Sequence, residues 1–353
     1  MRNFKTIYRP TWTLQKARKL NKLWLDKNEN THPKLLKLYE NILKNVNPIH
    51  VSTYPELGSL YKKISSYENL STKNIIFSHG SDGCIKNIFE TFTKKNQKVL
   101  TLSPTFVMYD IYPKIFKLNH VKFDYNFSKS GPIVNIEDLI KKIRSERPKL
   151  LCIANPNSPT GTIIEDTYIH TLIKVCRSIG CFLLIDEAYY GFYNKTAKKF
   201  IKEYNNIFII RSLSKAWGLA GLRLGYIISN KKNIELINQI RPMYEINTFG
   251  AEFLKLLLDK KYFVKLEFIL KEMIIAKNLF YKFLKKNKIN YFLSYANFVH
   301  FEIKENRKKI IRDLSKLSYF RVSENHKSLD NYSRLSLTSK NNIKKIMRIL
   351  KKK

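Results

Sequence analysis

The sequence predicts an α/β protein with a larger part built on a doubly wound, mostly parallel sheet and a smaller α+β unit. The 353-residue chain is longer than one hydrophobic core usually organises, which favours one large and one small domain. From residue 74 onward, short apolar runs alternate with helix-like segments. After about residue 250, the pattern changes to one long amphipathic helix and short strands.

The strands of the larger part are predicted from six apolar runs. Runs this short that are apolar nearly throughout are typical of strands buried on both faces of a sheet. They are NIIFSHG, KVLTLSP, KLLCIANP, CFLLIDEA, NIFIIRS and LGYIIS. Ligands of such sheets bind beyond the carboxyl ends of the strands. Polar residues gather at those ends, in the stretches 79–82, 103–106, 155–161, 186–190 and 212–215.

The smaller unit is predicted from the last hundred residues. Apolar residues recur at steps of three and four between Leu266 and Phe283, which indicates a long amphipathic helix. NFVHFEI and RLSLT are strand candidates, and a last helix carries Ile343, Ile346 and Leu350 on one face. We therefore divide the chain into residues 1–48, an N-terminal arm with part of the small domain, 49–245, the large domain, and 246–353, the small C-terminal domain.

The net charge raises nucleic acid or a membrane surface as a partner. The chain has 65 Lys and Arg against 28 Asp and Glu, a formal net charge of +37. The lysines are scattered singly and in short groups among many Asn, Ile and Tyr residues, which indicates a compositional bias instead of a binding face. We therefore expect neither a nucleic-acid partner nor a membrane partner.

The cysteines and the N-terminus bear on location. The four cysteines include no CxxC pair and no metal-like spacing with His, so we expect no metal site and no disulfide framework. MRNFKTIYRPTW lacks the apolar core of a signal peptide, and no apolar run approaches the ~18 residues of a membrane span. Together these features predict a cytoplasmic protein.

The stretch RSLSKAWGLAGLRLGY surrounds a lysine that differs from the other lysines. An exposed lysine, with a pKa of ~10.4, is protonated at neutral pH and becomes nucleophilic only when burial or a nearby cation disfavours its charge. Ser214, Ala216 and Gly218 are small enough to allow close approach to Lys215, and Arg223 supplies a cation. The alternative is an exposed lysine beside a tight turn.

Three more strand ends carry polar residues that could bind a ligand. Asp186 and Glu187 end an apolar run, where a carboxylate must be hydrated or paired with a cation. LLCIANPNSPTG ends in a Pro- and Asn-rich loop that can hold an amide against a planar ligand. FSHGSDG places a helix start, and its free N–H groups, after a strand, which favours an anion. Each feature alone also fits a turn, a cap or a loop.

Five motifs together carry a family resemblance. SLSKAWGLAGLRLGY, NPNSPTG, DEAYYGF, YPELGS and FSHGSDG resemble the pyridoxal-phosphate (PLP) aminotransferases of fold type I, and among them the histidinol-phosphate aminotransferase group. The resemblance runs from about Trp24 to Leu337. It implies that the large domain binds PLP, and it implies a homodimer with shared active sites.

The resemblance implies roles for the residues around the cofactor ring. Lys215 would bind the cofactor aldehyde covalently and then move a proton, and Asp186 would pair with the pyridine nitrogen and keep the ring an electron sink. Tyr189 and either Asn155 or Asn157 would contact the ring hydroxyl. These residues form the catalytic part of the predicted site.

The rest of the implied site holds the ring face and the phosphate. Phe106 would stack on the ring. A phosphate dianion calls for N–H groups, hydroxyls and a guanidinium. The matching positions are Gly80, Ser81, Asp82, Ser212, Ser214 and Arg223. Tyr54 would reach the phosphate from the neighbouring subunit.

Substrate recognition is assigned by the resemblance to two arginines of the C-terminal unit. Arg334 would grip an α-carboxylate or a substrate phosphate, and Arg321 would be the second arginine. A strand-edge arginine in a surface ion pair is the alternative for both. Ser158 and Gly83 depart from the family pattern, as does SLTSK, which lacks the usual glycine. The departures leave the cofactor residues intact and put histidinol phosphate in doubt as the substrate.

Three functions are compatible with this pattern. The first is an aminotransferase that moves an amino group between an amino acid, expected to be glutamate, and a 2-oxo acid or phosphorylated carbonyl compound. The second is a decarboxylase of an amino acid bearing a phosphate or phosphonate, with the same cofactor residues. The third treats the motifs as relics and the charge as the function, and intact Lys215, Asp186 and Arg223 argue against it.

Overall fold

A computed structural model describes residues 12–128, 131–324, 326 and 328–351. Residues 1–11 of the expected N-terminal arm lie outside the described residues. In the described part, no helix combines the length and the apolar character that crossing a membrane requires.

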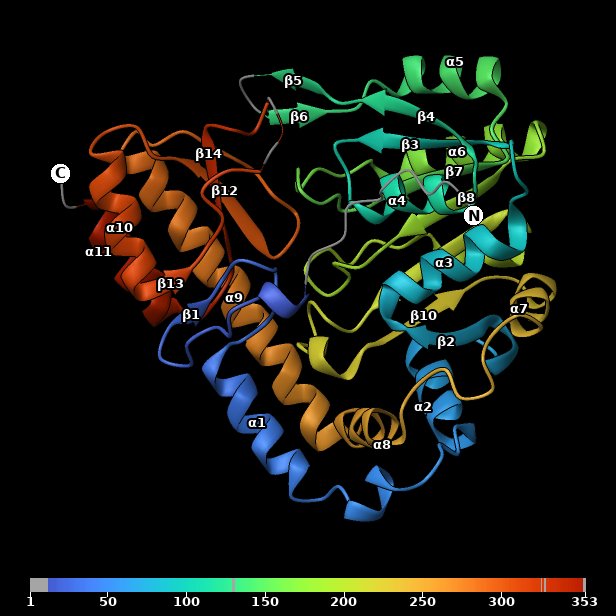
Figure 1. Ribbon diagram of the computed structural model, residues 1–353, viewed down its shortest axis with the longest axis horizontal. Helices are drawn as coiled ribbons and strands as arrows, with labels where there is room; N and C mark the ends of the chain where they lie inside the picture. Colours follow the sequence, from blue (N-terminus) through green and yellow to red (C-terminus); the bar gives the residue numbers. More distant parts are fainter. Residues whose placement is uncertain (1–11, 129–130, 325, 327, 352–353) are drawn as a thin grey trace.

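The large domain is organised by a seven-stranded sheet (Figure 1). Its order is β2 (Ile75–His79), β10 (Leu224–Ile228), β9 (Ile207–Ser212), β8 (Phe182–Asp186), β7 (Leu150–Ala154), β3 (Lys98–Ser103) and β4 (Asn119–Asp124). Every neighbouring pair is parallel except the two pairs that include β10. The predicted mostly parallel sheet is confirmed, and the carboxyl ends of β2, β3, β7, β8 and β9 meet at one edge.

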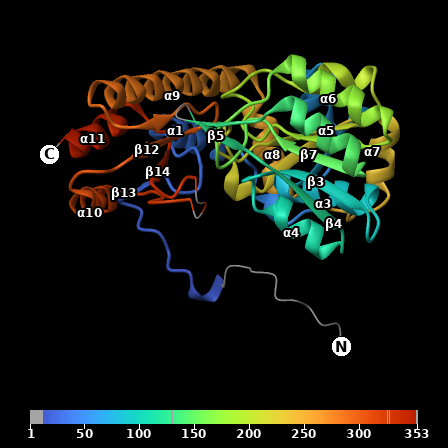
Figure 2. The same ribbon diagram turned by 90° about the horizontal axis from the view of Figure 1, so that it is seen from above.

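Helices cover both faces of this sheet (Figure 2). α3 (Gly80–Phe92) and α4 (Met108–Ile115) lie on one face, and α5 (Ile136–Glu146) and α6 (Asp166–Ser178) lie on the other. Alternate residues of one strand join different cores: Val99 packs in the cluster of α3 and α4, and Leu100 packs in the cluster of α5 and α6. This alternation explains why the predicted strands are apolar nearly throughout.

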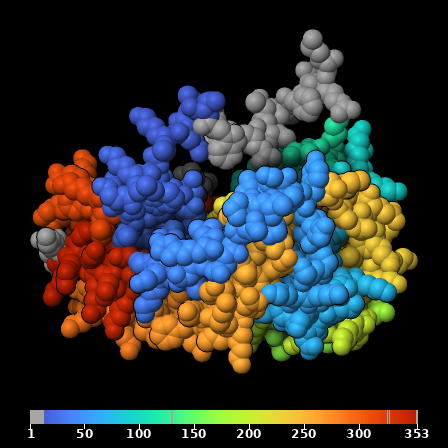
Figure 3. All heavy atoms as spheres, turned by 90° about the horizontal axis from the view of Figure 1, so that it is seen from below, coloured from blue at the N-terminus to red at the C-terminus, as the bar shows by residue number. Residues whose placement is uncertain are grey.

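The small domain contains a three-stranded antiparallel sheet with the order β11 (Tyr291–Phe292), β12 (Phe298–Glu302) and β14 (Tyr332–Ser336). The helices beside it are α9 (Lys260–Lys286), α10 (Arg307–Leu317) and α11 (Lys340–Lys351). The N-terminal segment joins this unit, because β1 (Leu23–Trp24) pairs with β13 (Ser318–Tyr319). Figure 3 shows the helix that follows, α1 (Pro33–Leu43), and the next residues in blue across the orange α8 (Thr248–Leu257) and α9.

The remaining elements connect these parts. The helices are α2 (Gly58–Glu68) and α7 (Lys231–Asn238), and a hairpin is formed by β5 (Asn126–Ser128) and β6 (Gly131–Ile133). Short 3-10 turns are η1 (Trp12–Leu14), η2 (Pro48–Val51), η3 (Thr72–Asn74), η4 (Ala197–Lys202) and η5 (Ala220–Leu222). α2 leads through η3 into edge strand β2, and α3 begins directly after β2.

Candidate active site

A cavity of about 390 Å³ lies at the carboxyl edge of the large sheet. Residues from five strand ends line it, as expected for a parallel sheet. Predicted residues on its walls are Ser81, Asp82, Phe106, Asp186, Tyr189, Ser212, Ser214, Lys215 and Arg223. The structure therefore brings together segments that are more than one hundred residues apart in the chain.

Lys215 follows β9 and projects into this cavity. Its Nζ donates a hydrogen bond to the carbonyl oxygen of Lys27 at 3.1 Å. Burial, together with the positive charges of Arg334 and Arg223, lowers the pKa of Lys215 to about 8. The neutral, nucleophilic amine is therefore far more populated at neutral pH than in an exposed lysine.

Asp186 ends β8 and is buried at the cavity wall. The Tyr109 hydroxyl donates to Oδ2 and the Ala188 N–H donates to Oδ1, both at 3.0 Å. Burial raises the pKa of Asp186 to about 6. Glu187 has the cation that a buried carboxylate needs, because it is paired with buried Arg211. No such direct ion pair to Asp186 exists among the described residues, so this carboxylate fits a cationic ligand.

The start of α3 and Arg223 form the opposite end of the cavity. Gly80 begins the helix with a φ of +74°, and a Cβ there would lie 2.9 Å from Nη2 of Arg223. Gly225 lets β10 lie close to the start of α3, because a Cβ at Gly225 would lie only 2.5 Å from the backbone carbon of Gly80. Ser212 and Ser214 add hydroxyls to the wall. A helix N-terminus, hydroxyls and a guanidinium together suit a phosphate.

Tyr189, Phe106 and Asp82 complete the walls of the cavity. The Tyr189 hydroxyl accepts a hydrogen bond from Nδ2 of Asn28 at 2.8 Å. Phe106 packs edge-on against Tyr109, with ring centroids 6.3 Å apart. Tyr112 donates to Oδ1 of Asp82 at 2.9 Å, which fixes that carboxylate on the first turn of α3. Sequence reasoning missed Lys27, Asn28 and Tyr109, because no local pattern marks a residue that reaches the site from another segment.

The structure does not bring either predicted asparagine to this cavity. The Asn155 amide bonds both backbone groups of Ile164, at 2.8 and 3.0 Å, and therefore holds its own loop closed. The Asn157 amide contacts Pro104, Thr105 and Thr160 at 2.7 to 2.9 Å. Ser158 lines the cavity in their place.

Tyr54 also lies away from the cavity of its own chain. Its side chain is 74% exposed and stacks on Tyr244, with ring centroids 4.3 Å apart. The contact with the phosphate that the resemblance implies for Tyr54 therefore requires a second chain, and that contact stays a prediction.

A smaller hollow of about 250 Å³ adjoins the cavity and contains the two predicted substrate arginines. It shares Phe106, Tyr189 and Lys215 with the larger cavity. Arg321 and Arg334 face one another across an antiparallel bridge, with Arg334 buried and Arg321 exposed. Glu324 also lines this hollow, and no sequence pattern marked it.

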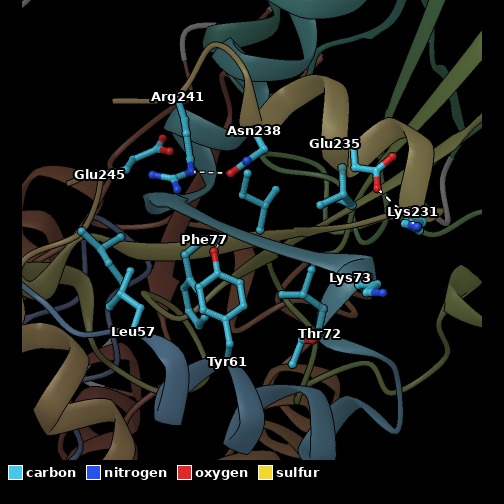
Figure 4. Close-up of a pocket in the computed structure, with 14 residues that line it drawn as sticks. Leu57, Tyr61, Thr72, Lys73, Phe77, Lys231, Glu235, Asn238, Arg241 and Glu245 are labelled. Atoms are coloured by element: carbon cyan, nitrogen blue, oxygen red, sulfur yellow. Dashed lines mark hydrogen bonds and ion pairs between the residues drawn. The ribbon is translucent and has the colours of Figure 1, made fainter. Parts of the chain in front are cut away.

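Another hollow, of about 430 Å³, lies beside edge strand β2 (Figure 4). Tyr61 and Phe77 form part of its wall. Its polar rim is internally paired: Arg241 Nε donates to Oδ1 of Asn238 at 2.7 Å, and Lys231 and Glu235 form an ion pair at 3.5 Å. None of the predicted site residues lines it. The candidate active site is therefore the cavity at the carboxyl edge of the sheet.

Residues 21–350 match the family model for class I and II aminotransferases. The chain belongs to this family. Members of the family depend on PLP, so the chain is a PLP-dependent aminotransferase of fold type I, as the motifs indicate. The residues present fit that cofactor, because an amine, the N-terminus of a helix and a buried carboxylate that forms no direct ion pair in the described part of the chain share one cavity.

Named relatives support this class I and II aminotransferase assignment. The chain is 33% identical to the histidinol-phosphate aminotransferase of Caldanaerobacter subterraneus subsp. tengcongensis, over 78% of this chain and 77% of the relative. The structure of the histidinol-phosphate aminotransferase from Clostridium acetobutylicum matches with a TM-score of 0.78 and 25% identity, over 93% and 98% of the two chains. A decarboxylase from Sulfurospirillum multivorans shares the fold, with a TM-score of 0.81 and 22% identity, over 94% and 88%.

Proposed function

We propose that Lys215 is the residue that binds the PLP aldehyde and that Asp186 pairs with the pyridine nitrogen. The observation that carries the proposal is the pairing of a lysine with a lowered pKa and a buried carboxylate without an ion-pair partner in one cavity. Arg223, Ser212, Ser214 and the start of α3 would hold the phosphate. Tyr189 and Ser158 would contact the ring hydroxyl and Phe106 would contact the ring face, since all three line the cavity.

The bound cofactor supplies an electron sink that makes the Cα–H bond of an amino acid acidic. Lys215 Nζ would accept the proton from Cα of the substrate and would later donate a proton back to the reacting atoms. Its lowered pKa keeps part of the amine unprotonated and able to accept that proton at neutral pH. Asp186 must be ionised to favour a protonated pyridine nitrogen, and a cation beside it lowers its pKa from the raised value.

The substrates are proposed from the two arginines. Arg334 and Arg321 would orient the anionic end of the amino donor and of the acceptor beside Lys215, since all three residues line one hollow. Glutamate is the proposed donor, and a 2-oxo acid or phosphorylated carbonyl compound is the proposed acceptor. The four cysteines of the chain are buried free thiols, which supports the proposed cytoplasmic location.

Replacing Lys215 by Ala tests the central assignment. We expect turnover to fall by at least about a thousandfold, because covalent attachment and proton transfer are lost together. Steady-state formation of 2-oxoglutarate from glutamate measures it. Lys37→Ala, at an exposed position of α1, is the control and should retain wild-type turnover. Turnover retained by the Lys215 variant would refute the assignment.

The same assay separates transamination from decarboxylation. A glutamate-dependent transfer forms 2-oxoglutarate and converts the bound cofactor to its amine form, with no carbon dioxide released. Carbon dioxide release from a phosphate-bearing amino acid, without formation of 2-oxoglutarate, would favour the decarboxylase.

A further inference from the structure

A buried carboxylate stands between the two arginines that are proposed to hold the substrate anion. Oε1 of Glu324 lies 2.7 Å from Nε of Arg334, and the two side chains are only 3% and 5% exposed. Oε2 of the same glutamate lies 3.7 Å from Nη1 of Arg321. Glu324 thus contacts both guanidinium groups on the wall of the substrate hollow.

The histidine beside this carboxylate adds no charge. His300, opposite Arg334 in the β12–β14 register, has Nε2 3.9 Å from Oε1 of Glu324. Burial and the charge of Arg334 lower the pKa of His300 to about 3, so the imidazole is neutral. Lys27 and Lys215 also line the hollow, together with the two arginines and this carboxylate. The charge of Glu324 therefore lowers the positive charge of the hollow by one.

This charge favours one class of anion. A carboxylate carries one negative charge and is satisfied by a single guanidinium fork. A phosphate ester near pH 7 carries between 1.5 and 2 negative charges, roughly, because its second pKa is about 6. Glu324 repels such a dianion about twice as strongly as a carboxylate, in a buried site where screening is weak.

The hydrogen bonds that the two arginines already donate also favour a carboxylate over a phosphate. Nε of Arg321 donates to the carbonyl oxygen of Asp26 at 3.1 Å. Nη2 of Arg334 reaches the same carbonyl at 3.5 Å. Part of the donor capacity of both arginines is therefore committed within the protein, which disfavours a ligand with three anionic oxygens more than one with two.

We propose that Glu324 is a specificity-determining residue that makes the substrate site select a carboxylate over a phosphate dianion. The compound that exchanges its amino group with glutamate is then a carboxylate without a phosphate, namely an amino acid and its 2-oxo acid. The inference rests on the proposed function, because it assumes that Arg321 and Arg334 face the substrate. It separates this chain from the histidinol-phosphate aminotransferases, whose named substrate carries a phosphate.

Equilibrium anion binding to the PLP-loaded enzyme tests this selectivity. Acetate and inorganic phosphate are titrated separately at pH 7.5 and followed by calorimetry and by the absorbance of the bound cofactor. The wild type should bind acetate more tightly than phosphate. Glu324→Gln should strengthen phosphate binding by about tenfold or more and should change acetate binding by a smaller factor, because removal of a like charge matters more to the dianion.

Two variants keep the test decisive. Glu324→Asp retains the charge and should retain the preference for acetate. Asp330→Asn removes one charge from an exposed position of the same loop and should leave both affinities unchanged. A wild type that binds phosphate as tightly as acetate, or an unchanged ratio in Glu324→Gln, would overturn the inference.

The failure of this inference is distinguishable from the failure of the proposed function. A wild-type protein that binds no PLP, or whose bound PLP does not respond to glutamate, contradicts the proposed function. An unchanged anion ratio in an enzyme whose cofactor does respond to glutamate contradicts only the role of Glu324.

Discussion

Lys215 is distinguished from the other basic residues by its surroundings and not by its own side chain. The chain has 65 Lys and Arg residues, and most lysines lie in water, where the ammonium form is stable. Lys215 lies in a cavity with Arg223 and near Arg334, so its charged form loses hydration and meets repulsion. The small residues around it in SLSKAWGLAG allow this placement without a packing conflict.

In the cofactor-free protein, the buried carboxylate of Asp186 lowers the free energy of unfolding, and this effect is measurable. Its folded pKa of about 6 lies above the usual 3.8. The folded state therefore holds a proton that the unfolded state has released, and stability is lost as pH rises between about 4 and 6. We expect cofactor-free Asp186→Asn to be more stable than cofactor-free wild type at pH 7.5, by roughly 2 to 3 kcal/mol.

Urea denaturation at pH 4 and pH 7.5 measures this difference. The two proteins should converge near pH 4, where the carboxyl of Asp186 is protonated in the folded state. Asp124→Asn, exposed on β4, is the matched control and should follow the wild type at both pH values. An Asp186→Asn protein that is less stable than wild type at pH 7.5 would contradict this account.

The same variant should bind PLP more weakly, because it lacks the anion for the ring nitrogen.

The sequence predicts the residues of the cofactor cavity better than their partners. Motif residues such as Ser214 and Asp186 lie at strand ends, and the parallel topology is sufficient to bring strand ends together. Tyr109, Asn28 and Glu324 act on the site through tertiary contacts with distant segments, so no spacing in the chain marks them. The amides of the two predicted asparagines bond backbone groups of loop residues, so their contact with the cofactor stays a prediction.

At the scale of elements, the close approach of β10 to the start of α3 shapes the part of the cavity that is proposed to hold the phosphate. A Cβ at Gly225 would lie 2.5 Å from the carbon of Gly80 and 2.6 Å from the nitrogen of Ser81. Both contacts are with backbone, so neither can be relieved by rotating a side chain. We expect Gly225→Ala to weaken PLP binding by at least about tenfold and to destabilise the fold by about 1 to 3 kcal/mol.

Equilibrium titration with PLP, followed by absorbance, measures the effect of Gly225→Ala. Gly58→Ala adds the same methyl group where nothing lies within 4 Å, and it should leave the affinity unchanged. Wild-type affinity in Gly225→Ala would mean that the distance between β10 and α3 does not matter for the phosphate.

The predicted elements differ from the observed ones mainly at short or half-exposed strands. All six apolar runs of the large domain became strands, because burial on both faces makes them continuous in sequence. β4 was not predicted, because it is an edge strand with a half-exposed, polar sequence (NHVKFD). β1 and β13 are two residues long and pair across almost the whole chain, which leaves no periodic signal.

At the scale of the molecule, the N-terminal segment packs on the small domain and also contacts residues of the cavity in the large domain. β1 pairs with the small domain, and the next residues place the Lys27 carbonyl on Lys215 and Asn28 on Tyr189. We propose domain boundaries after residues 48 and 245 on this basis. The segment 23–29 is then the part of the small domain that lines the cavity.

The exposed surface near Tyr54 supports the proposed homodimer. Val51, Tyr54 and Met243 are 75%, 74% and 78% exposed, which is unusual for apolar side chains of this size.

If Tyr54 completes the site of the other chain, mixing Lys215→Ala and Tyr54→Phe subunits creates one site with both native residues. We expect the mixed protein to be more active at limiting PLP than either variant alone. Activity no greater than the average of the two would place Tyr54 outside the partner's site.

The central claim is that one lysine of this very basic chain carries the cofactor. Borohydride reduction of the PLP-loaded protein, followed by peptide mapping, tests it directly because reduction fixes the cofactor to the lysine that holds it. The predicted result is a single modified peptide, with the cofactor on Lys215. A label on a different lysine, or labels spread over many lysines with none enriched at residue 215, would contradict the account.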